Sequence, residues 1–123
     1  WTGHWVFDFI FQKNEDAINK WHSLGHLLNH TITYSILWLL YLITTMGFVN
    51  LLFIYGFVVT TFFAHTIQDY FTSKITHYLH NKAEKAPGEK NYTNFFVMIG
   101  LDQLLHYIQI MLTWYFFQHL IFN

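Results

Sequence analysis

The sequence contains no cysteine and no arginine, and it has a single proline. Without cysteine, disulfides and thiolate metal sites are excluded. Charged residues make up only 11% of the chain, against about 25% in soluble domains, whereas hydrophobic residues make up 54%. This composition is typical of a membrane protein. With a formal net charge of -1 and no basic patch, the chain lacks the features of a nucleic-acid-binding protein.

The longest uncharged stretch covers residues 21–68. As helix it would extend roughly 70 Å, enough to cross a hydrocarbon core of about 30 Å twice. It therefore predicts a helical hairpin in the membrane, with its tight turn at residues 46–48. A second apolar stretch, residues 91–123, is interrupted only by Asp102 and predicts another span.

The chain begins without Met, inside an apolar run that ends in Gln12 and Lys13. We interpret this run as a first helix truncated at its N-terminus. The polar segment 82–90 contains the only proline, Pro87, and is the clearest break in the chain. The expected fold is all-α: one transmembrane domain over residues 1–123, a polytopic four-helix bundle with helices at about 1–12, 21–44, 49–81 and 92–120.

Three aspartates lie within the apolar segments, and each has a histidine four residues away. The pairs are His4 with Asp8, His65 with Asp69 and Asp102 with His106, and His26 and His30 repeat the spacing without a carboxylate. Residues four apart share one helical face, so each pair can close on one ion or one proton path. Counted from the turn, His30 and His65 fall at the same depth, about 24–26 Å. We expect all four pairs to form one ring.

An aspartate near the middle of a span costs about 2.5–3.5 kcal/mol, so these carboxylates need partners. Hydrogen bonding that only holds the bundle together is one interpretation. Metal binding is another, because imidazole and carboxylate bind Zn, Mn or Fe, and four-helix bundles hold one or two such ions. Haem is a third. The predicted metal ligands are His4, Asp8, His26, His30, His65, Asp69, Asp102 and His106, with Gln12, Gln103 and Lys74 supporting them.

All six lysines fall on the side of the bundle opposite the turn at residues 46–48. Positive residues in short loops favour the cytoplasm. The sequence therefore predicts that the polar loops and the site face the cytoplasmic, or matrix, side of the lipid bilayer.

Segments 4–12, 26–30, 65–69 with Lys74 beyond, and 101–106 resemble the signature of a family of small bacterial and phage membrane proteins, domain-of-unknown-function family 3307. The more specific elements are Asp-Phe-x-x-Gln at the end of the first helix and Asp-Gln-x-x-His in the last. The resemblance covers nearly the whole chain and implies a polytopic helical fold, but the family brings no established activity. A more distant similarity, in the His/Asp-rich helices only, extends to membrane-bound metal-dependent hydrolases.

The first functional interpretation is a metal-dependent hydrolase acting on an amphiphilic or lipid-linked substrate at the cytoplasmic interface. A bound ion would activate water, and an unliganded Asp or His would act as general base. The alternative is a non-enzymatic subunit of a larger membrane complex, such as a haem-binding respiratory anchor. Haem needs no aspartate as an iron ligand, so that alternative leaves the three aspartates without a role.

Overall fold

The computed structural model describes residues 2–122, and within that range it contains helices and no strand. The all-α prediction is confirmed. The elements are α1 (Thr2–Trp5), the π-helix η1 (Val6–Ile10), α2 (Asn14–Asn19), α3 (Leu24–Met46), the 3-10 helix η2 (Phe48–Asn50), α4 (Leu51–Glu84) and α5 (Thr93–Phe122).

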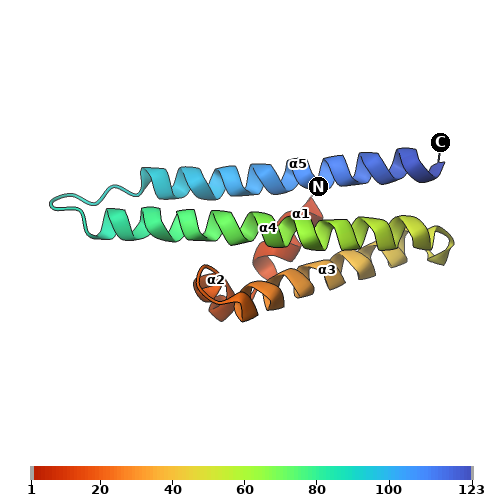
Figure 1. Ribbon diagram of the computed structural model, residues 1–123, viewed down its shortest axis with the longest axis horizontal. Helices are drawn as coiled ribbons and strands as arrows, with labels where there is room; N and C mark the ends of the chain where they lie inside the picture. Colours follow the sequence, from red (N-terminus) through yellow and green to blue (C-terminus); the bar gives the residue numbers. More distant parts are fainter. Residues whose placement is uncertain (1, 123) are drawn as a thin grey trace.

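Three helices, α3, α4 and α5, dominate the structure, and each is long and apolar enough to cross a membrane. Figure 1 shows α4 and α5 side by side along the long axis, with α3 packed against the part of α4 next to the apolar turn. The other ends of α4 and α5 project beyond α3 as a hairpin. The three predicted long helices therefore exist, with boundaries that differ from the predicted ones by one to three residues.

The predicted first helix differs most from the expectation. It ends at Ile10, before Gln12, and its second half is a π-helix. Residues 14–19, which lie between the first and second predicted helices, form α2. The N-terminal arm, α1 with η1, lies against α3, and its side chains also reach α5.

The turn between α3 and α4 depends on one glycine. Gly47 has φ of 68° and donates its backbone N–H to the carbonyl of Ile43 at 2.9 Å. This left-handed conformation is unfavourable for any residue with a Cβ. The backbone conformation that Gly47 adopts thus explains why the chain turns at residues 46–48, as predicted.

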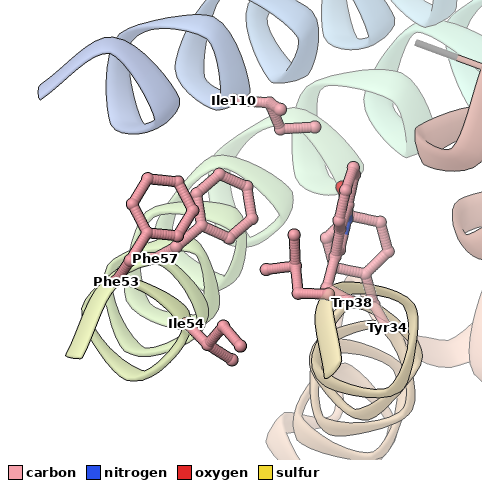
Figure 2. Packing of buried hydrophobic residues seen from close by; sticks show 7 residues of the cluster. Tyr34, Trp38, Phe53, Ile54, Phe57 and Ile110 are labelled. Atoms are coloured by element: carbon pink, nitrogen blue, oxygen red, sulfur yellow. The ribbon is translucent and has the colours of Figure 1, made fainter. Parts of the chain in front are cut away.

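The apolar core fills the space between α3 and α4 near this turn (Figure 2). Tyr34 and Trp38 of α3 face Phe53 and Phe57 of α4, and Ile110 of α5 lies against the same group. The rings meet mostly edge to face, as between Trp38 and Phe57 at 5.4 Å between ring centroids. This core fixes the relative depth of α3 and α4, and so the level of the residues farther along both helices.

Gly56 of α4 lies against a side chain of α5, because a Cβ there would lie 2.3 Å from Cε1 of Phe117. We therefore expect Gly56→Ala to force the Phe117 ring out of its packing and to lower stability by about 1–3 kcal/mol. Thermal unfolding in detergent measures the change. Gly100→Ala is the matched control, since that site on α5 is open and alanine favours the helix. Equal melting of the two variants would contradict the close approach.

Candidate metal centre

The structure gathers seven of the eight predicted ligands into one buried group where the N-terminal arm meets α3, α4 and α5. We call this group the His–Asp cluster. Its buried members lie 3% or less exposed, and Asp102 lies at its edge. The cluster consists of His4 and Asp8 of the arm, His30 of α3, His65 and Asp69 of α4, and Asp102 and His106 of α5.

His30 lies at the centre of the cluster. Its Nε2 is 3.0 Å from Oδ1 of Asp8, 3.2 Å from Oδ2 of Asp69 and 3.2 Å from Nε2 of His65. The short distance between the two imidazoles confirms that His30 and His65 lie at one level, as their equal separation from the turn predicts. One imidazole nitrogen thus faces two carboxylates from different elements.

His65 is completely enclosed and is held by an aromatic ring. The Tyr34 ring stacks on it at 4.1 Å between centroids with 13° between planes. Its Nε2 lies 3.5 Å from Oδ1 of Asp8 and 3.7 Å from Oδ2 of Asp69, too far for hydrogen bonds. The Tyr34 hydroxyl also hydrogen-bonds Nδ1 of His4 at 2.7 Å. Tyr34, four residues after His30, therefore orients two histidines of the cluster.

The tautomer of His106 follows from its geometry. Its Nδ1 lies 2.8 Å from the backbone carbonyl oxygen of Asp102, which can only accept, so Nδ1 carries the proton. In the neutral ring Nε2 is then unprotonated. This nitrogen is buried without a hydrogen-bond partner and points towards Oδ1 of Asp69, which also has none, at 3.6 Å. A backbone carbonyl bound to the far nitrogen is the usual way in which a metal-binding histidine is oriented.

Lys20 reaches into the cluster, which the sequence analysis did not anticipate. Its Nζ donates to Oδ2 of Asp69 at 2.9 Å, and its side chain is only 17% exposed. Burial alone would lower the pKa of Lys20, but the carboxylates of Asp69 and Asp8 raise it above its usual value, so the ammonium stays charged at neutral pH. No helical spacing relates Lys20 to Asp69. Only the path of the segment between the arm and α3 brings them together.

His26 is the predicted ligand that lies apart from the cluster, and its place in the ring has to be corrected. Its Nδ1 bonds Oδ1 of Asp16 in α2 at 2.8 Å, and its side chain is 36% exposed. Asn29 donates to the other oxygen of Asp16 at 2.5 Å. The physical reason is position: His26 lies in the first turn of α3, beside α2, which offers a nearer carboxylate.

The three predicted supporting residues have different surroundings. Gln103 donates to Oδ2 of Asp8 at 2.9 Å, so it does support the cluster. The Nε2 of Gln12 is buried without a hydrogen-bond partner. Lys74 instead lies over the ring of Tyr70 at 3.6 Å, and Lys20 is the lysine that contacts Asp69. The expected supporting role of Lys74 at Asp69 is therefore corrected. The segment that precedes α3 brings Lys20 to the Asp69 carboxylate instead.

The comparisons with known proteins return no match to a family model, to a curated protein or to a solved structure. The chemistry of this site therefore has to be argued from its own geometry.

Two overlapping sets of side chains in the described part of the chain have ligand atoms close enough to hold one ion. Asp8, His30 and His65 form the first, and His65, Asp69 and His106 form the second. Within each set the ligand atoms lie within 4.8 Å of one another. His65 belongs to both, so it is the residue on which metal binding depends most.

The Lys20–Asp69 pair predicts a large loss of stability when only one partner is removed. Lys20→Met leaves the Asp69 carboxylate buried beside Asp8 without its ammonium, and we expect a loss of about 3 kcal/mol. Thermal unfolding in detergent measures it. Asp69→Asn in the Lys20→Met background should restore part of the loss, whereas Lys13→Met, at an exposed lysine in the same segment, should change little. If the two lysine variants melt alike, the ion pair does not support the fold.

The Asp16 carboxylate predicts a pH dependence. Burial alone would raise its pKa, but hydrogen bonds from His26 and Asn29 and the charge on Lys13 outweigh burial and lower it. A lowered folded-state pKa stabilises the fold above the unfolded value of about 4, and this contribution is lost as pH falls through the folded value.

We therefore expect Asp16→Asn to be less stable than the native chain by about 1 kcal/mol at pH 7. The difference should shrink as pH falls below about 4, where the native carboxyl is also neutral. Paired unfolding curves at both pH values measure it, with Glu15→Gln, at the exposed neighbour in α2, as the control. A difference that does not change with pH would show that the Asp16 charge plays no part.

Proposed function

We propose that the His–Asp cluster binds a divalent metal ion and that the protein is a membrane-embedded, metal-dependent hydrolase. The observation that carries the metal is the spacing of the ligand atoms. An ion with bonds of about 2.0–2.2 Å in tetrahedral geometry holds its ligands about 3.3–3.6 Å apart. The nitrogen-to-oxygen distances between His30 or His65 and the two carboxylates run from 3.0 to 3.7 Å. The two His65 distances, 3.5 and 3.7 Å, are longer than hydrogen bonds, whereas the two His30 distances, 3.0 and 3.2 Å, fit hydrogen bonds as well as a shared ion.

Charge supports the same conclusion. With the three carboxylates ionised and the imidazoles neutral, Asp8, Asp69 and Asp102 carry three negative charges and Lys20 supplies one positive charge. Two uncompensated negative charges in a buried site are costly. One divalent cation would neutralise them while leaving the imidazoles neutral, the state in which they bind metal.

The ligand set narrows the choice of metal. Imidazole and carboxylate without thiolate favour Zn, Mn or Fe, as one ion or as two that are bridged by a carboxylate. The geometry favours a compact ion over haem. Bis-histidine haem requires a porphyrin plane between the two nitrogens, and the Nε2 atoms of His30 and His65 are only 3.2 Å apart.

We infer that the three long helices lie in a bilayer and that the cluster lies near one face of it. His65 is 14 residues into α4, about 21 Å from the apolar turn along a helix that continues to Glu84. The lysines beyond the cluster favour the cytoplasmic, or matrix, side for that face. An amphiphilic substrate would then present its polar bond at headgroup depth.

Hydrolysis is the reaction that this donor set supports best. A divalent ion supplies a Lewis acid for a phosphoryl or acyl oxygen and a bound water that ionises near neutral pH. Asp102, at the edge of the cluster and 16% exposed, is the carboxylate best placed to accept the proton of that water. Lys20, charged and inside the site, would stabilise negative charge that develops on the substrate.

Metal analysis of the protein purified in detergent tests the proposal. The native chain should carry stoichiometric Zn, Mn or Fe, and His65→Ala should lose it because His65 belongs to both candidate ligand sets. Chelator should lower the melting temperature of the native chain and leave that of His65→Ala unchanged. His26→Ala, which removes a histidine of α3 outside the cluster, should keep both the metal and the chelator response.

Turnover is measured on the same samples with short-chain phosphate and carboxylate esters. Metal-dependent hydrolysis by the native chain and by His26→Ala, but not by His65→Ala, supports the hydrolase. Stoichiometric metal without turnover of either ester class would instead favour a non-enzymatic subunit of a membrane complex. An absence of metal with no chelator response in any variant would overturn the metal centre and the hydrolase together.

A further inference from the structure

A pocket of about 640 Å³ lies on α4 beyond the N-terminal end of α3, outside the His–Asp cluster. We call it the basic pocket. One side is closed by the segment that leads into α3, and the rest is formed by successive turns of α4. Its lining residues are Trp21, Lys74, His77, Tyr78, Asn81, Lys82 and Lys85.

The basic pocket is positively charged and contains no carboxylate. Three lysines line it, and among the described residues none of them is paired with an acidic side chain. Glu84, the nearest acidic residue in the sequence, is bound elsewhere: it accepts hydrogen bonds from Lys90 and from Tyr92. The positive charge is therefore available to a ligand.

The wall of the basic pocket is built from stacked aromatic rings. The indole of Trp21 stacks on the imidazole of His77 at 3.6 Å between centroids and 9° between planes. Asn81, one turn farther along α4, donates to Nε2 of His77 at 2.7 Å and holds the ring in place. Amphipathic rings beside lysines are the side chains that gather at the headgroup level of a bilayer.

The basic pocket adjoins the His–Asp cluster through two consecutive residues. Lys20 reaches inward to Asp69, and Trp21 forms the pocket wall. Lys74 lies five residues after Asp69, about 7.5 Å along the axis of α4. A ligand held by the pocket would thus lie next to the segment through which Lys20 contacts the cluster.

We propose that the basic pocket binds the phosphate group of an anionic amphiphile and holds it beside the cluster. This inference rests on the proposed function in one respect, that the bound molecule is the substrate of the metal centre; the binding itself does not require a metal. Three ammonium groups complement a phosphate, and the rings of Trp21 and Tyr78 complement the apolar part next to it.

Calorimetry of the full chain in a neutral detergent tests the binding. The probes are dihexanoyl phosphatidic acid, dihexanoyl phosphatidylcholine and inorganic phosphate. We expect phosphatidic acid to bind, and the double variant Lys82→Gln with Lys85→Gln to weaken it by about tenfold or more. The control, Lys13→Gln, removes a positive charge from an exposed lysine that does not line the pocket and leaves the Lys90–Glu84 pair intact, and it should change the affinity less than twofold.

The probes separate the two sources of phosphate. Weaker binding of inorganic phosphate than of phosphatidic acid identifies a lipid headgroup. Equal binding of the two, with the same loss in the pocket variant, supports the phosphate site with free phosphate as its ligand. Equal loss in the pocket variant and in Lys13→Gln, loss in neither, or equally tight binding of phosphatidylcholine overturns the proposal. Metal analysis of the same samples reports on the cluster separately, so a failed metal centre and a failed phosphate site give different results.

Discussion

The placement of two carboxylates against one imidazole between apolar helices is the constraint on which this structure depends. Asp8 and Asp69 come from elements far apart in the chain, and both contact Nε2 of His30. Two carboxylates that contact the same nitrogen atom repel each other strongly in an environment of low dielectric constant. Positive charge and hydrogen-bond donors must therefore surround them, and the ammonium of Lys20 and the amide of Gln103 do so.

This constraint also explains why the N-terminal arm folds into the bundle. The arm is short and its outward side chains are apolar, with Trp5, Phe9 and Ile10 exposed. Its inward side chains, His4 and Asp8, are the polar ones. A helix with this pattern gains little from packing among apolar helices unless its polar side meets partners. The contacts of Asp8 and His4 with α3 and α5 supply them.

Several features of the fold and the site could be predicted from the sequence because each depends on counting residues along a helix. The turn lies at Gly47, and His30 and His65 are almost the same number of residues from it, so they lie at one level. The errors concern residues near helix ends. A four-residue spacing places His26 and His30 on one face, but it does not reveal that α2 offers Asp16 to the first of them.

The contact of Lys20 with Asp69 is another feature that residue spacing along a helix does not predict. It depends on the course of an irregular segment that tertiary packing decides and that no periodicity encodes. The resemblance to a family of small membrane proteins stays a prediction, and that family brings no activity of its own. Function has to be argued from the side chains themselves, because one helical architecture can host unrelated chemistries.

The π-helix in the arm makes the number of residues there matter as much as their identity. Its backbone bonds span five residues rather than four, so the arm holds one residue more than an α-helix would in that turn. Deleting a single residue from Val6–Ile10 would let the arm relax to α geometry. If Val6 or Phe7 is the residue deleted, His4 and Asp8 would be three residues apart instead of four, and their relative orientation about the helix axis would change. Such a deletion could leave every cluster side chain in the sequence and still separate His4 from Tyr34, so the arm tolerates changes of side chain more readily than changes of length.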